Sequence, residues 1–235
     1  METLADIRQA IEDDLTVGSE STLYSTALIN RAINRAYRKA GSLFQWPELK
    51  DAKKTTTQVN QEYYDYPSTW RSDSIWKIRI NNIKYGEEPD GSPLSFDDYL
   101  NWREDYPDYT DKKWANHQRR FFVTPTPTVA GLVVCIWGFT VTETLTSDSN
   151  VTIFSYSMPE GNEAIVLEAV AILKAKGENE KAGEFRSMEA KQILATAWGR
   201  IRKEQAKYEK NMPFLDVPDF FGGTNSKDLR GRFDI

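Results

Sequence analysis

The spacing of apolar residues changes twice along this chain of 235 residues, and that change constrains the fold more than any other feature. Apolar residues recur every three or four positions up to about residue 50, as they do on one face of a helix. From about residue 53 to 141 they alternate with polar residues, as they do in half-buried strands. The helical spacing returns after residue 158. The pattern predicts an α+β protein in which a strand-rich region separates two helical regions.

We expect this order of regions: helices over 1–50, antiparallel strands over 51–157, helices over 158–211 and an extended arm over 212–235. Within the strand-rich region, residues 54–59 and 62–66 are predicted to pair as a hairpin around Asn60. A second hairpin is expected around Asn81 and Asn82, because asparagine tolerates the positive φ that a tight turn requires.

The helix predicted after Ser21 and Thr22 has an apolar and a basic face. A long helix predicted from about 178 to 210 carries a basic face as well. Either face could contact DNA or an acidic neighbour, while a solvated face is the alternative, since charged outer faces are usual on amphipathic helices. The basic residues expected to face a channel or a neighbouring molecule are Arg31, Arg35, Arg38, Arg200, Lys203 and Lys207.

The helical pattern ends at Pro213, and the remaining segment combines large apolar side chains with Pro and Gly. A segment of this kind cannot bury its apolar groups by itself. It either packs back over its own domain or docks in a groove of a partner, and the sequence leaves both possibilities open. The residues expected to dock are Phe214, Leu215, Val217, Phe220, Phe221, Leu229 and Phe233.

The chain shows no recognisable catalytic motif, and we expect neither enzyme activity nor a metal or other cofactor. Nine Asp or Glu and one Arg lie between Glu87 and Asp111, but their spacing matches no EF-hand loop. We expect them to form a solvated acidic rim. Cys135 is the only cysteine and is predicted to be a small core residue. His117 is the only histidine, and a surface or loop position is expected for it.

The charge balance limits the partners of the protein. The formal net charge is −5, and a protein that wraps nucleic acid tightly must instead neutralise phosphates. DNA that only passes the protein remains compatible with this charge. No apolar run approaches the roughly 20 residues that span a bilayer, so no membrane contact is expected. The first residues lack a signal-peptide pattern, which indicates synthesis in the cytoplasm.

Six short motifs follow one another between about residues 25 and 205. In chain order they are Leu28–Arg38 in the basic helix, Phe44-Gln45-Trp46-Pro47-Glu48-Leu49 at its end, Glu62-Tyr63-Tyr64-Asp65-Tyr66-Pro67, Ile78-Arg79-Ile80-Asn81-Asn82, Phe121-Phe122-Val123-Thr124-Pro125-Thr126-Pro127 and Met158-Pro159-Glu160-Gly161-Asn162-Glu163-Ala164. Their order and spacing resemble those of the head-to-tail adaptor (connector) proteins of tailed phages. The chain has no short diagnostic motif of that family, and its tail is not recognisable as a family arm.

The resemblance implies a helical bundle with an inserted β-rich lobe and an extended C-terminal arm that grips the portal protein. It also implies a structural virion protein of the neck, made in the host cytoplasm. Neighbouring copies would form a ring, typically of twelve, between the portal and a tail or nozzle protein. Double-stranded DNA would pass through the channel of this ring with only transient contact.

Three alternatives stay open at this point. The first, a tail terminator or stopper, belongs to the same class of virion proteins. The second is a carboxylate-dependent hydrolase, which would require the acids between Glu87 and Asp111 to converge in a cleft. The third is a nucleic-acid-binding module that uses Arg31, Arg35 and Arg38, and it would bind DNA with a steep dependence on salt.

Overall fold

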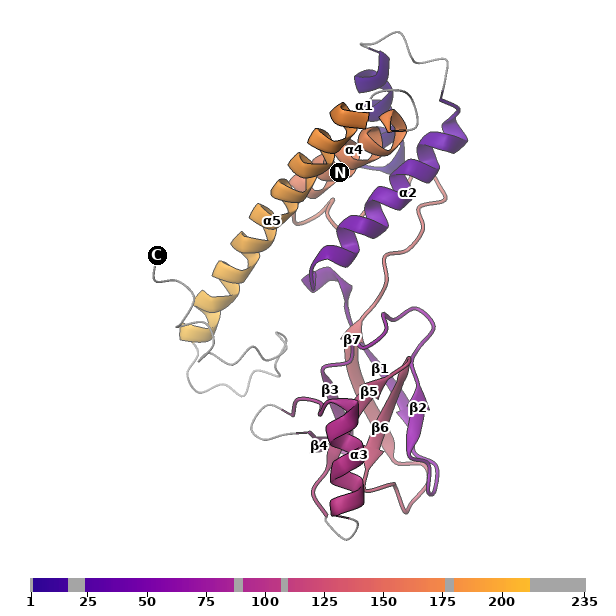
Figure 1. Ribbon diagram of the computed structural model, residues 1–235, viewed down its shortest axis with the longest axis vertical. Coiled ribbons are helices and arrows are strands. Elements are labelled where there is room, and N and C mark those ends of the chain that lie inside the picture. The colour runs from indigo at the N-terminus through magenta and orange to yellow at the C-terminus, as the bar shows by residue number, and fades with distance from the viewer. Residues whose placement is uncertain (1, 17–23, 87–90, 107–109, 176–179, 212–235) are drawn as a thin grey trace. The chain divides into compact units, whose positions relative to one another are not determined.

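The structure is a computed structural model that describes residues 2–16, 24–86, 91–106, 110–175 and 180–211 (Figure 1). These described residues contain five α-helices and two antiparallel sheets. The predicted α+β class is therefore confirmed. The chain divides into two compact units. The helical unit comprises the described parts of 1–49 and 141–213, and the β unit comprises residues 50–140.

The helical unit is organised around α4 (Pro159–Lys174). Helices α1 (Leu4–Thr16), α2 (Thr26–Leu43) and α5 (Glu180–Asn211) all contact α4. Since α4 is enclosed by these neighbours, its apolar residues extend almost all the way round it, as expected for a buried helix. The fully buried ones include Ala164, Ile165, Ala169, Val170 and Leu173.

Helix α2 begins and ends at identifiable residues. Ser25 is the N-cap, and its side chain accepts a hydrogen bond from the backbone N–H of Leu28. At the other end the backbone becomes extended at Phe44, before a short 3-10 helix, η1 (Pro47–Leu49). Trp46 is fully buried there and donates from its Nε1 to the carbonyl oxygen of Ala40, at 2.9 Å. Its ring also packs edge-on against Phe154. These contacts fix the direction in which the chain leaves α2.

The segment from 141 to 157 belongs to the helical unit, whereas we expected it in the strand-rich region. Side chains of the helices hold it in place. The Tyr37 hydroxyl accepts a hydrogen bond from the backbone N–H of Ile153 at 3.1 Å, and the Thr152 hydroxyl donates to Asn162 at the start of α4. The segment has no helical spacing of its own, so the sequence pattern could not show that it joins the helices.

The β unit contains two antiparallel sheets and one helix. One sheet has the order β1 (Lys50–Thr56), β7 (Val133–Phe139), β3 (Lys77–Ile80) and β4 (Ile83–Tyr85). The other has the order β2 (Tyr63–Asp65), β6 (Arg120–Thr124) and β5 (Lys113–His117). Helix α3 (Phe96–Asp105) packs against β5. One hydrophobic core draws residues from both sheets, among them Ile78, Val134, Ile136, Tyr64, Phe121 and Val123.

The two hairpin predictions have different outcomes. Strands β3 and β4 pair directly, and Asn81 and Asn82 between them both have positive φ, so the second hairpin is confirmed. The first is wrong, because β1 pairs with β7 and β2 pairs with β6 in the other sheet. Asn60 does turn the chain with positive φ. The turn at Asn60 thus leads the chain from one sheet to the other.

Candidate interaction surfaces of the helical unit

Three arginines on α2 form an exposed surface that we call the basic face: Arg31, Arg35 and Arg38. Among the described residues no carboxylate forms an ion pair with any of them. They line a hollow of about 480 Å³, whose wall also includes Leu28, Thr144 and Ile172. Arg38 donates from its Nε to the carbonyl oxygen of Asn34 at 3.2 Å. The basic face therefore combines guanidinium groups that form no ion pair with a described carboxylate and apolar side chains beside them.

Asn34 holds a loop against α2 next to the basic face. Its Nδ2 donates to the carbonyl oxygen of Leu145 at 3.0 Å, and its Oδ1 accepts from the backbone N–H of Leu145 at 2.7 Å. The Nδ2 donates also to the carbonyl oxygen of Asn30, at 3.0 Å. Since Asn34 and Leu145 are both buried, these bonds satisfy backbone groups that water does not reach.

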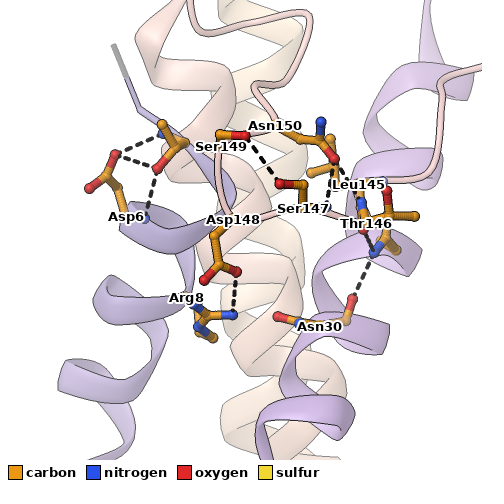
Figure 2. Close-up of polar contacts among 11 residues, drawn as sticks. Asp6, Arg8, Asn30, Leu145, Thr146, Ser147, Asp148, Ser149 and Asn150 are labelled. Carbon is orange, nitrogen blue, oxygen red and sulfur yellow. Dashed lines mark hydrogen bonds and ion pairs between the residues drawn. The ribbon is translucent and has the colours of Figure 1, made fainter.

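The same loop is tied to α1, as Figure 2 shows. The carbonyl oxygen of Asn150 accepts a hydrogen bond from the backbone N–H of Leu4 at 2.8 Å. Arg8 forms an ion pair with Asp148 at 3.0 Å. The hydrogen bond from Arg8 lowers the pKa of the Asp148 carboxyl and raises the pKa of the Arg8 guanidinium. The loop from 145 to 150 thus connects α1 with α2 and holds the basic face on a fixed support.

A second surface of the helical unit is acidic. We call it the acidic groove, a depression of about 520 Å³ between α1 and the first turns of α4. The carboxylates that line it are Glu2, Asp6, Glu160 and Glu163, and its apolar lining includes Ile7, Ala10 and Val166. Glu2 and Glu163 are exposed, and neither forms an ion pair with a described residue.

The other two carboxylates of the acidic groove have partners in the same chain. The backbone N–H of Thr3 donates to Asp6 Oδ2 at 2.8 Å, as does the Thr3 hydroxyl, and these bonds lower the pKa of Asp6. Arg200 of α5 forms an ion pair with Glu160 and lowers the pKa of that carboxyl. Glu2 and Glu163 are therefore the carboxylates that remain available to another molecule.

The six basic residues singled out from the sequence do not form one site. Arg31, Arg35 and Arg38 share the basic face, whereas Arg200 and Lys203 do not line that hollow. Arg200 is paired with Glu160, and Lys203 is exposed on α5. The side chain of Lys207 lies outside the described part of the structure. So do all the arm residues expected to dock: Phe214, Leu215, Val217, Phe220, Phe221, Leu229 and Phe233.

The acidic stretch of the β unit shows no convergence where it is described. Its described acids are all exposed: Asp97, Asp98, Glu104, Asp105 and Asp111. Ser95 is the N-cap of α3 and accepts a hydrogen bond from the backbone N–H of Asp98 at 3.1 Å. Over the described ranges no three His, Cys, Asp or Glu residues gather in a way that could hold a metal ion.

The single histidine and the single cysteine both lie on strands. His117 is half-buried at the end of β5, where its ring stacks on Phe96 with a centroid distance of 4.0 Å. Cys135 is half-buried on β7, although we predicted a core residue. The alternation along β7 explains this difference, since Val134 and Ile136 point into the core and Cys135 points to the opposite face.

Comparison with protein-family models finds no match to this chain, and comparison with curated proteins finds none. None of the helices in the described part of the chain is long and apolar enough to cross a membrane. The function must therefore be inferred from the residues of the chain itself.

Proposed function

We propose that this protein is a head-to-tail adaptor of a tailed phage, which forms a ring between the portal and the tail. The observation that carries the proposal is the order of the elements. Helices α1 and α2 precede the β unit, and α4 and α5 follow it. The family-like motifs occur in the same order along the chain. In this proposal the helical unit is the bundle of the adaptor, and the β unit is its inserted lobe.

Two charged surfaces on one helical unit suit a protein that acts by assembly. The basic face and the acidic groove offer exposed charges of opposite sign, and Arg31, Arg35, Arg38, Glu2 and Glu163 form no ion pair with a described residue. Each has apolar side chains beside the charges, so each offers apolar surface for burial within a polar rim. The net charge of −5 keeps the ring from binding the DNA in its channel tightly.

The arm over residues 212–235 is proposed to dock on the portal. Its large apolar residues could bury several hundred Å², or several kcal/mol at about 25 cal/mol per Å². The cost of ordering a segment that contains Gly reduces this gain for each subunit. In a ring the gain is multiplied, since each further arm binds at a high effective concentration. Free subunits are therefore expected to be monomeric or weakly associated, and to form the ring on the portal.

The proposal is tested by replacing Phe220 and Phe221 with alanine in the full chain. Because these side chains are proposed to contact the portal, the double variant should lose binding to purified cognate portal rings in negative-stain images and in co-sedimentation. Its melting temperature as a free subunit should change by less than about 2 °C, as expected for residues outside the core. Lys227→Ala in the same arm is the matched control and should bind normally.

Deletion of residues 213–235 extends this test. The shortened chain should keep its helical circular dichroism and lose portal binding. If the variant with Phe220→Ala and Phe221→Ala melts at a much lower temperature than the wild type and still binds portal rings, the arm belongs to the core of the subunit and the docking proposal fails.

A further inference from the structure

The basic face and the acidic groove lie on the same compact unit and do not neutralise each other within the chain. The described acids form no ion pair with Arg31, Arg35 or Arg38, and neither Glu2 nor Glu163 is paired with a described cation. Unpaired charges of opposite sign on two separate surfaces are complementary to each other in a second copy of the chain. This complementarity gives partner choice and register more than raw affinity.

The placement of the charges suits a helix lying in a groove. At 1.5 Å per residue, Arg31 and Arg38 lie about 10 Å apart along α2. Glu2, just before α1, and Asp6 of α1 line one side of the acidic groove, and Glu160 and Glu163 line the other side from α4. Ala10 and Val166 provide apolar surface between them. An amphipathic helix with arginines on its exposed face could lie in this groove with carboxylates on both sides.

We propose that the basic face of α2 in one copy docks in the acidic groove between α1 and α4 of the next copy. That these contacts close into a ring rests on the proposed adaptor function. The new element is the pair of surfaces through which neighbouring copies touch. The two surfaces are different, so the contact is heterologous. Each copy uses one surface and offers the other, and such contacts produce a ring when the rotation closes.

A second copy explains the two surfaces better than DNA does. The basic face consists of three arginines along α2 and borders on Leu28 and Ile172, whereas a phosphate backbone offers no apolar partner for those side chains. DNA would also leave the acidic groove without a role. A contact made of exposed charges is weak in a free subunit, which agrees with a ring that forms on the portal.

The decisive test is a charge exchange in the full chain. One variant carries Arg31→Glu and Arg35→Glu, and the other carries Glu2→Arg and Glu163→Arg. Each alone should associate at least about fivefold more weakly than the wild type in sedimentation velocity at low salt, because like charges then meet. An equimolar mixture should recover wild-type association, since a reversed face then meets a reversed groove. Lys191→Glu with Arg202→Glu, both exposed on α5, is the control for the arginine variant, because it changes the net charge by the same amount.

A covalent trap decides the outcome if the association is very weak. Arg35→Cys and Glu163→Cys, combined with Cys135→Ser and treated with oxidised glutathione as the oxidant, should give a ladder of disulfide-linked dimers, trimers and larger species. An isologous contact through other surfaces would stop at dimers. Failure of the mixture to recover association, or absence of both the ladder and wild-type association up to about 1 mM, overturns the proposal.

Two further readouts separate this inference from the adaptor function. Both charge variants keep the arm, so they should still bind portal rings as single subunits without closing an adaptor ring on them. If the wild type self-associates as described but ignores the portal, the adaptor function fails and the contact stands. Binding of a fluorescent DNA duplex is the second readout. If Arg31→Glu with Arg35→Glu abolishes duplex binding and leaves self-association unchanged, the basic face is a nucleic-acid site and the proposal is wrong.

Discussion

Replacement of Asn34 by leucine should destabilise the helical unit severely, although the two side chains are similar in size. The amide of Asn34 makes a two-way pair with the backbone of Leu145. Leucine cannot replace either bond, so the N–H and C=O of Leu145 would be left buried without partners. A stranded group of this kind costs about 1–3 kcal/mol. Two such groups are stranded, and local rearrangement of the loop can relieve part of the cost, so we expect a total loss of about 2–4 kcal/mol.

The loss can be measured by urea unfolding followed by circular dichroism at 222 nm, which reports mainly on the long helices. Arg31→Ala on the same helix is the control, because Arg31 is exposed and unpaired among the described residues, and it should change the unfolding free energy by less than about 0.5 kcal/mol. If Asn34→Leu costs no more than this control, the loop is not anchored by Asn34, and the account of the support under the basic face is refuted.

Two other predictions follow from the packing and the charges of the helical unit. Gly161→Ala should lower the unfolding free energy by about 1–3 kcal/mol, because the added Cβ would overlap the buried side chain of Phe154. Gly199→Ala is the control: its Cβ would meet no atom within 4 Å, so it should raise the unfolding free energy by up to about 1 kcal/mol. Arg200→Met should raise the pKa of Glu160 toward the ordinary value of about 4.3 in a carboxyl NMR titration. The pKa of Glu160 is lowered in the folded wild type. The ion pair therefore stabilises the fold at pH values above the ordinary pKa of a glutamate, and this contribution is lost as the pH falls through the pKa of the folded state. No shift of the Glu160 titration in the variant would show that Arg200 does not interact with it in solution.

Local features of the fold could be predicted from the sequence, and pairing over long distances could not. The turn at Asn81 and Asn82 depends on two residues that tolerate positive φ, so it is visible in the sequence. The turn at Asn60 is equally visible. However, the partner of β1 is β7, about 80 residues away, and the turn at Asn60 does not specify that pairing. A turn motif predicts a change of direction and does not predict which strands pair.

The same division applies to the two interaction surfaces. Helical spacing alone places Arg31, Arg35 and Arg38 on the exposed side of α2, as predicted. The acidic groove was missed, because Glu2 and Glu163 lie about 160 residues apart and meet only when α1 packs on α4. The pair of Arg200 with Glu160 depends on the packing of α5 on α4 in the same way. The acidic first turns of α4 are the only signal in the sequence that could have indicated this groove.

The pairing of β1 with β7 has a consequence for the order of folding. The first residue of β1, Lys50, pairs with Phe139, so the chain enters and leaves the β unit at neighbouring positions. The two halves of the helical unit are separated by about 90 residues of chain until that pairing forms. Once it has formed, the halves are joined by the equivalent of a loop of a few residues. Pairing of β1 with β7 has then already borne the entropic cost of closing the larger loop. Docking of α2 on α4 is therefore more favourable by about 3 kcal/mol. Folding of the β unit therefore shortens the effective connection between the two halves of the helical unit and promotes their packing.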